Sequence, residues 1–498
     1  MTMVTMPVWT YPPGPSAHEE VTVMASGRIR QDVWGLSVKT AQAAQTQSWH
    51  PVLDGYARAV AAMQSLPDSQ VNSWLWAANI HGIPPGTPAN AWWDQCAHGS
   101  HFFLPWHRGY LRWFEKVVQA QIGDDTWALP YWDYSDPNNP NATQIPPEFT
   151  VPTRVVNGVS VANSLFLDAT DRPGQPAVED VDIVTALAET LYVDDPMQGF
   201  GGVTGPEPTH GLLEQLPHDF VHVDIGGDTG LMRTPSLAAR DPIFWLHHSN
   251  IDRLWEVWRG LRGSIELTAQ TGIPADVVTE WTSTDFAYGG PHANVKYSIN
   301  QLLDLTNTAL NYGYEVTTLA PSLLAQVQAN RGQEAPSIMA FEDAATPPPP
   351  SEPWHPVAAT PATTKVTGTG TQQTLTFDQR QLGLLAQPAA APPSGLLIKL
   401  SGVRAPVDCY NVYFVEVAAS PGAPTHRAGR FATFGLCGTP PDETRNYVID
   451  ASAVINDLVA DGWTGDRLVV HVIPDTQGAT PDPARELHVS QITVYQQR

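Results

Sequence analysis

The feature that most restricts the fold of this chain is a proline-rich segment, AATPPPPSEPWHPVAATPATT, at residues 344–364. Proline has no amide hydrogen and fixes its own φ angle, so we expect neither helix nor sheet ladder here, but an extended linker. A chain of 498 residues is also too long for one ordinary domain. The sequence therefore predicts two domains, residues 1–343 and 365–498, joined by this linker.

The two parts carry different hydrophobic patterns. Before the linker, tryptophan-rich segments have apolar residues at helical spacing, as in VNSWLWAANIHG, LPWHRGYLRWFEKVVQAQI and DPIFWLHHSNIDRLWEVWRGL. After it, short runs such as LLIKL, YNVYFVEV and RLVVHVI alternate with glycine and proline turns. This predicts a mainly α first domain and an all-β second domain folded as an antiparallel sandwich. Residues 385–395, LAQPAAAPPSG, are expected to form a long loop.

Composition excludes several classes of partner. A formal charge of -24 argues against nucleic acid and anionic membranes, which both need a basic surface. No apolar run reaches the roughly eighteen residues of a membrane span, and the first residues lack the pattern of a secretory signal. Three cysteines, Cys96, Cys409 and Cys437, cannot supply a disulfide framework. We therefore expect a cytoplasmic protein without nucleic acid or membrane partners.

Histidines are concentrated in the first part of the chain. In HDFVH, His218 and His222 are four residues apart, so on a helix both rings project from one face. The motif is only a partial match to the zinc-protease pattern HExxH, because Asp219 stands where that pattern needs glutamate. Without further support, such a pair is more often a coincidence than a metal site.

The segment DPIFWLHHSNIDRLWEVW predicts a second histidine-bearing helix. Pro242 suits a first helical turn, with Asp241 as its cap. Adjacent histidines on a helix lie about 100° apart, so only one of the pair can face a common centre. Asp252, one turn after His248, is well placed to orient an imidazole or its helix. The alternative is that both rings are ordinary half-buried helix residues.

Three more histidines lie in CAHGSHFFLPWHR, residues 96–108. Proline is tolerated only in the first turn of a helix, so the helix that carries His107 should begin near Pro105. His98 and His101 then lie in the irregular segment before it. Upstream, His81 ends another helical pattern, which Gly82 terminates.

Together these clusters resemble the type 3 copper proteins: the tyrosinases, catechol oxidases and molluscan haemocyanins. His98, followed nine residues later by the histidine of LPWHR, fits the copper A signature of that family. HDFVH followed by DPIFWLHHSNIDRLW fits the copper B signature, HxxxH and then DPxFxxHHxxxDxxW. LPYWDYSDP at 129–137 fits the LPYWxW segment of the family. The resemblance covers residues 27–316.

The resemblance implies a four-helix bundle around two copper ions, which bind dioxygen between them as peroxide. Neutral imidazole suits copper in both of its oxidation states. The implied copper A ligands are His81, His98 and His107, and the implied copper B ligands are His218, His222 and His248. His101 and His247 are then not ligands. Asp252 and Phe244 would contact the ligand histidines, rather than the metal ions, and hold them in position.

The resemblance also implies roles for residues outside the ligand set. Cys96, two positions before His98, has the spacing of the cysteine that forms a thioether to this histidine in fungal tyrosinases and molluscan haemocyanins; the alternative is a free buried thiol. Tyr312-Gly313-Tyr314 resembles a motif of plant polyphenol oxidases that packs on an N-terminal arginine, here Arg30. In plants and fungi the β-domain covers the copper site of a latent enzyme. The turn at 420–429 is our candidate for the loop that enters it.

Four activities remain open within this resemblance. The partners are small phenols and dioxygen, and we favour tyrosinase activity over that of a catechol oxidase or o-aminophenol oxidase, or of a haemocyanin-like carrier. Glu214 and Asp219 are candidates for holding the water that deprotonates a monophenol, although Glu214 could also be a solvated helix-end carboxylate. Pro235 stands where many plant enzymes place a bulky phenylalanine, so we expect it to line an open substrate funnel with Val223. The oligomeric state is not predicted.

Overall fold

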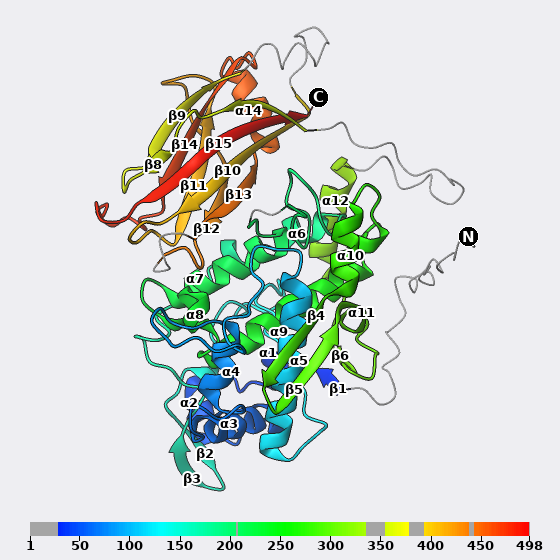
Figure 1. Cartoon of the computed structure of the whole chain (residues 1–498). Helices are drawn as coiled ribbons and strands as arrows, with labels where there is room; N and C mark the ends of the chain where they lie inside the picture. Colours follow the sequence, from blue (N-terminus) through cyan, green and yellow to red (C-terminus); the bar gives the residue numbers. More distant parts are fainter. Residues whose placement is uncertain (1–27, 206–207, 335–353, 378–392, 438–442, 498) are drawn as a thin grey trace, which may run out of the picture.

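The computed structural model describes residues 28–205, 208–334, 354–377, 393–437 and 443–497, which form a helical body and a β body. Figure 1 shows the β body above the helical one in that view, with β12 nearest to α7. The predicted fold class, a mainly α domain followed by an all-β sandwich, is confirmed. Within the described residues, no helix is both long enough and apolar enough to cross a bilayer.

The helical body is built around α5 and α9, which pack against each other, while α3 packs on the other side of α5. Its longer helices are α3 (Pro51–Gln64), α4 (Trp74–His81), α5 (Phe103–Ile122), α7 (Phe220–Gly226), α9 (Pro242–Gly260), α10 (Ala275–Ser283) and α12 (Pro321–Glu334). The short helices are α1 (Val33–Leu36), α2 (Ala41–Thr46), α6 (Val184–Ala188), α8 (Pro235–Ala238), α11 (Ile299–Leu302), η1 (Pro147–Phe149), η2 (Val178–Asp180), η3 (Glu214–Asp219), η4 (Leu231–Arg233) and η5 (Leu267–Ala269). Three two-stranded sheets complete it: β1 (Arg28–Arg30) with β6 (Tyr312–Tyr314), β2 (Thr153–Val156) with β3 (Val159–Ala162), and β4 (Asp285–Gly290) with β5 (Ala293–Ser298).

The predicted helix boundaries near the histidines hold. Helix α9 begins at Pro242, and the Asp241 carboxylate accepts from the Ile243 amide at 2.9 Å, which satisfies a free N–H group of the first turn. Helix α5 begins at Phe103, so Pro105 lies in its first turn. His81 is the last residue of α4, which Gly82 ends.

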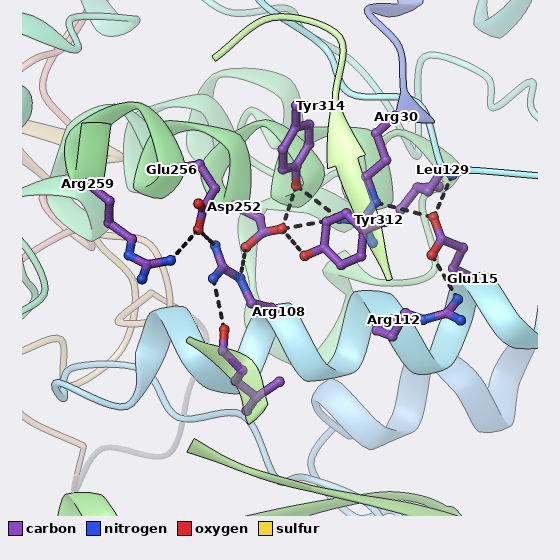
Figure 2. Close-up of polar contacts among 11 residues, drawn as sticks. Arg30, Arg108, Arg112, Glu115, Leu129, Asp252, Glu256, Arg259, Tyr312 and Tyr314 are labelled. Atoms are coloured by element: carbon purple, nitrogen blue, oxygen red, sulfur yellow. Dashed lines mark hydrogen bonds and ion pairs between the residues drawn. The ribbon is translucent and has the colours of Figure 1, made fainter. Parts of the chain in front are cut away.

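One carboxylate on α9 ties both ends of the helical body together. Asp252 accepts from Arg30 (3.2 Å) and from the hydroxyls of Tyr312 and Tyr314 (2.5 Å each). It also accepts from Arg108 on α5 at 2.5 Å (Figure 2). The Arg30 guanidinium lies 3.8 Å above the Tyr312 ring, so the predicted packing of the tyrosine motif on Arg30 is confirmed. Asp252 therefore links α9 to the neighbouring elements, through hydrogen bonds from arginines and tyrosines.

The β body consists of two sheets packed face to face. One has the order β13-β10-β15-β7, with β8 also paired to β15, and the other has the order β12-β11-β14-β9. The strands are β7 (His355–Ala359), β8 (Thr364–Val366), β9 (Thr371–Thr376), β10 (Gly395–Arg404), β11 (Val412–Ala418), β12 (His426–Ala432), β13 (Arg445–Asp450), β14 (Arg467–Pro474) and β15 (Leu487–Gln497). η7 (Ser452–Val454) and α14 (Ile455–Ala460) follow β13. Alternating residues of both sheets, such as Leu396, Ile398, Val415 and Val470, fill the space between them.

The predicted linker is wrong over its second half. Residues 344–353 lie outside the described residues, but His355–Ala359 form β7, which pairs antiparallel with β15. Proline is excluded from central strands because it cannot donate a ladder hydrogen bond, yet β7 is an edge strand, where Pro356 is tolerated. The predicted loop at 385–395 lies outside the described residues up to residue 392.

Two of the three cysteines form a single disulfide, which the sequence analysis did not predict. Cys409, before β11, and Cys437, after β12, form a disulfide across 28 residues. No local pattern marks such a pair, because only the pairing of β11 with β12 brings the two residues together. Closing a loop of this length removes unfolded-state entropy worth roughly 3–4 kcal/mol in the chain-entropy treatment.

Arginines join the two bodies. Arg233 on the helical body donates to Asn411 at 3.0 Å and to Asp408 at 2.9 Å, both next to Cys409. Arg430 on β12 pairs with Asp180 and lies 4.8 Å from the centre of the Phe220 ring. The β body is therefore held on the face of the helical body that carries η3, α7 and α8.

Candidate metal centre

The first histidine group comes from one helix end, one loop and one helix. His81 ends α4, His98 lies in a turn, and His107 lies in the second turn of α5. One ligand atom from each of these residues, together with the Cys96 sulfur, lies within 4.8 Å of all the others. The sequence therefore folds so that three imidazoles and a thiol converge without sharing a helix.

Backbone carbonyls orient most of these rings. His81 Nδ1 lies 2.8 Å from the Pro235 carbonyl, and His107 Nδ1 lies 2.9 Å from the Phe103 carbonyl. A carbonyl can only accept, so each Nδ1 carries the proton and each Nε2 keeps a lone pair. The His81 Nε2 atom is buried with no hydrogen-bond partner among the described residues. A buried nitrogen lone pair of this kind is what a metal ion requires.

The second group lies on η3, α7 and α9. His218 and His222 have ring centres 4.5 Å apart, as expected for neighbours on one helical face. His218 Nδ1 lies 3.2 Å from the Glu214 carbonyl, and His222 Nδ1 lies 2.9 Å from the Met232 carbonyl. The Nε2 atoms of His222 and His248 face each other at 3.3 Å.

The two groups share one core. The rings of His107 and His248 stack with centres 4.3 Å apart and planes 13° apart. Phe244, one turn before His248, packs against both groups, 4.9 Å from the His81 ring and 4.2 Å from the His248 ring. Two ions held by these groups would therefore be neighbours inside one buried core.

Burial keeps these histidines neutral. It lowers the pKa of His81 to about 4, and it lowers the pKa of His98, His107, His218, His222 and His248 well below the ordinary value. Neutral imidazole with a free Nε2 is the form that binds copper. The donor set, the oriented rings and the unpartnered nitrogens thus fit two copper ions, with three or four ligands each.

The two histidines predicted not to be ligands differ in position. His101 lies outside both groups, and its Nδ1 is 3.2 Å from the Val203 carbonyl. His247 is fully buried, neither of its ring nitrogens has a hydrogen-bond partner among the described residues, and one of them lies within the second group. Geometry alone therefore leaves His247 beside His248 as a fourth nitrogen donor.

A carboxyl pair lies beside the histidines. Both Glu214 oxygens accept from the amide of Gly99, the residue after His98, at 2.9 and 3.2 Å. Asp219 accepts from His218 Nδ1 at 3.0 Å through one oxygen, and its other oxygen lies 2.6 Å from His210 Nδ1. Burial raises the pKa of Glu214 to about 8 and that of Asp219 well above its ordinary value. Glu214 is thus no solvated helix-end residue.

Cys96 lies between two histidines of the first group. Its sulfur is 3.4 Å from His107 Nε2 and 3.6 Å from His98 Nε2. Burial, followed by the charge of Glu214, raises the pKa of the thiol well above its ordinary value.

Two residues of the β body reach the histidines, and sequence reasoning missed both. The Phe434 ring stacks on the His222 ring, with centres 4.0 Å and planes 14° apart. It also meets His98 and His218 edge-on, at 5.5 and 5.4 Å. Arg445 at the start of β13 lies 2.8 Å from His210 Nε2 and donates to the Phe434 carbonyl at 2.5 Å.

The candidate plug loop at 420–429 is therefore wrong. Its second half belongs to β12, which begins at His426, and the segment that enters the site is Thr433–Cys437, after that strand. The sequence TFGLC contained one signal that could have indicated this segment. An aromatic residue is followed by glycine, and a cysteine stands two positions after the glycine. A Cβ at Gly435, where φ is +75°, would lie 3.0 Å from the Pro235 ring and closer still to Arg445. Glycine allows this close approach.

The predicted funnel residues lie on the same side. Pro235 begins α8, and its carbonyl holds His81 while its ring faces Gly435. Val223 follows His222 on α7 and is buried in the helical core under the docked β body.

Comparisons with known proteins agree with this geometry. Residues 71–179 and 167–261 match the family described as the common central domain of tyrosinase, and residues 353–497 match a domain of unknown function (DUF7868). The chain is 30% identical to a tyrosinase of Hahella sp. (strain CCB-MM4), over 94% of this chain and 99% of that protein.

Two plant proteins are also similar. The chain is 28% identical to the latent form of a chloroplastic polyphenol oxidase of Prunus armeniaca, over 54% of this chain and 48% of that protein. The fold is similar to that of a latent apple tyrosinase, with a TM-score of 0.53 and 19% identity over 96% of this chain and 99% of that one.

Proposed function

Because this chain belongs to the tyrosinase family of type 3 copper proteins, we propose that it hydroxylates monophenols to o-diphenols and oxidises o-diphenols to o-quinones with dioxygen. The family uses two copper ions, and the chain carries two histidine groups that fit them. The observation that carries the proposal is the convergence of these groups in one buried core. As ligands we propose His81, His98 and His107 for one ion and His218, His222 and His248 for the other.

Copper bound at these groups supplies the binding and reduction of dioxygen. The protein's own contribution is orientation and proton transfer. Carbonyl hydrogen bonds at Nδ1 hold the rings in one tautomer, which directs Nε2 toward the metals. Phe103 and Phe244 pack against the rings and exclude water.

Glu214 is the proposed base for a monophenol proton, through a water molecule. Once it has lost its proton, a buried carboxyl with a pKa of about 8 is a stronger base than an ordinary carboxylate, which is the property a general base needs. We propose that Asp219 acts on the same water but mainly orients His218, since its two oxygens already contact two imidazoles. Because both Asp219 oxygens are occupied by imidazoles, one second candidate function is favoured: a catechol oxidase or o-aminophenol oxidase with little activity on monophenols.

The test compares substrates in a single variant. Oxygen uptake by the copper-loaded protein is measured with tyramine, catechol and 2-aminophenol, before and after Glu214→Gln. The amide cannot take up a proton, so we expect the tyramine rate to fall by roughly 100-fold or more, the contribution of a general base. Catechol, which gives up its protons more readily, should lose much less.

The matched control is Glu148→Gln, at a fully buried glutamate that also accepts a backbone amide, from Val38 at 2.8 Å, far from the histidines. It should leave the ratio of tyramine to catechol rates unchanged. Equal losses on both substrates in Glu214→Gln would assign Glu214 to structure. Uptake with catechol or 2-aminophenol but not with tyramine in the unmodified protein would select the second candidate.

We propose in addition that Cys96 forms a thioether to the His98 ring. Its sulfur already lies at contact distance, and a covalent link would hold a ligand that no helix supports. The bond would replace S–H and a ring C–H, and dioxygen would take up the two electrons and two protons to give hydrogen peroxide. After copper loading in air, the peptide containing residues 96–98 should be two hydrogens lighter by mass spectrometry, and Cys96→Ser should abolish this difference. An unchanged mass with a titratable thiol would rule the bond out.

Finally, we propose that the β body keeps the enzyme latent. Phe434 covers the face of the His222 ring, so a phenol ring could not stack on that proposed ligand while Phe434 is in place. The disulfide at Cys437 and the hydrogen bond from Thr433 to the Tyr410 carbonyl (2.7 Å) fasten this segment to the loop that Arg233 holds. The proposed block is therefore steric, and the segment Thr433–Cys437 that carries Phe434 is fastened at both of its ends.

A further inference from the structure

The segment that blocks the site brings a positive charge with it. Arg445 is buried, and its guanidinium donates both to the Phe434 carbonyl and to His210 Nε2. Because His210 Nε2 accepts this bond, its Nδ1 carries the proton and donates to Asp219. The neutral imidazole thus connects the guanidinium to the carboxylate.

The helical body presents two acidic groups to this guanidinium. Glu214 lies 3.5 Å from His210 Nε2, the atom that Arg445 contacts, and Asp219 lies on the other side of the same ring. Among the described residues, every ion-pair contact of these two carboxyls within 4.0 Å is to a histidine. When the β body leaves, Arg445 leaves with it, and the two buried carboxyls lose their nearby guanidinium.

The Phe434 ring and the Arg445 guanidinium are arranged like the ring and the cation of a phenolic amine. The Phe434 ring lies on His222, and the guanidinium meets the same residue a few bonds away, at its carbonyl oxygen. A phenol with a short alkylammonium tail has the same order of groups: a flat ring, a short aliphatic spacer and a cation. A buried carboxyl that has given up its proton stabilises such a cation more than water-exposed charges do.

We propose that Phe434 and Arg445 together occupy the place of a phenolic substrate with a cationic tail, so that the opened site selects phenolic amines over neutral and anionic phenols. The ring subsite is the face of His222, and the cation subsite is formed by His210, Glu214 and Asp219. This inference rests on the proposed oxidase function. It names the substrate class of that same site.

The experiment uses the full copper-loaded chain with the ring subsite opened by Phe434→Ala. The value of kcat/KM is measured for dopamine (cationic), 4-methylcatechol (neutral) and 3,4-dihydroxyhydrocinnamic acid (anionic), with and without Arg445→Gln. Removing the guanidinium should raise the ratio of dopamine to 4-methylcatechol by about tenfold or more, the size of one charge-assisted hydrogen bond. The ratio of the acid to 4-methylcatechol should fall.

Arg430→Gln in the same Phe434→Ala background is the matched control. Arg430 also joins the two bodies, but it pairs with Asp180, so its loss loosens docking and leaves the cation subsite filled. Its ratios should stay at the Phe434→Ala values. Equal ratios with and without Arg445, or the same rise in the Arg430 control, would overturn the proposal.

A binding measurement separates this inference from the proposed function. In the copper-loaded Phe434→Ala/Arg445→Gln protein, calorimetry should detect 2-phenylethylammonium binding at least about tenfold tighter than 3-phenylpropionate. Adding Glu214→Gln should reduce that preference. If no variant oxidises any catechol, the proposed function fails, and this binding preference still decides whether the cation subsite exists. Equal binding of amine and acid refutes it.

Discussion

Replacing His248 by Ala is expected to abolish oxygen uptake with 4-methylcatechol and to reduce bound copper from two ions to one. The physical reason is that its Nε2 faces His222 Nε2 at 3.3 Å while its ring stacks on His107, at the junction of the two histidine groups. Changing an outer partner of a ligand costs roughly 10- to 100-fold in affinity or activity, so losing a ligand should exceed that. Metal analysis and oxygen uptake on the same sample check it.

The neighbouring residue supplies the control. His247 is as deeply buried as His248, and its side chain is chemically identical, so His247→Ala creates a cavity of the same kind in the same turn of α9. We expect this variant to retain two copper ions. If His247→Ala lost one ion and His248→Ala kept both, the assignment of the ligand within the pair would be reversed. If both kept two, the second site would use other residues.

Replacing Phe434 by Ala is expected to raise the 4-methylcatechol oxidation rate of the full-length protein by roughly 10- to 100-fold without protease or detergent. Burying a phenylalanine side chain contributes about 1.5–3 kcal/mol, and removing it shifts the closed-to-open equilibrium by the corresponding factor. The shift is measurable as kcat/KM on untreated protein. The same variant should gain little on further protease treatment, because its site is already open.

Phe414→Ala is the matched control for this prediction. Phe414 lies on β11 of the same sandwich, beneath the guanidinium of Arg427 rather than against the histidines. Its replacement should leave the 4-methylcatechol oxidation rate at the value of the unmodified protein. A Phe434→Ala protein that stays folded, copper-loaded and no more active than the unmodified chain would contradict the steric block.

The local features of this protein were predictable because their causes are local. Pro105, Pro242 and Gly82 mark helix ends through backbone restrictions that act within one turn, so the placement of His81, His107 and His248 followed from neighbouring residues. The family motifs then related segments that are far apart in the chain. Strand alternation in the second domain was visible for the same reason.

The features that were missed depend on contacts between distant segments. Phe434 and Arg445 reach the histidines only because the β body docks on the helical body, and no pattern in the neighbouring sequence indicates that contact. The Cys409–Cys437 disulfide likewise follows from the pairing of β11 with β12. Pro356 predicts a break in any strand, and the local sequence does not indicate that β7 lies at a sheet edge, where proline is tolerated.

The Asp252 network has a consequence for how this protein can be switched on. Arg30 at the start of the helical body and Tyr314 near its end meet at one carboxylate on the histidine-bearing helix α9. A cut between Glu334 and Trp354 therefore leaves these Asp252 contacts together in one fragment. Redocking cannot undo the cleavage of a peptide bond, whereas the opening that we propose requires no covalent change. On this proposal the same protein can be activated in two ways. Undocking of the β body opens the site until the β body docks again, whereas cleavage between the two bodies activates the protein permanently.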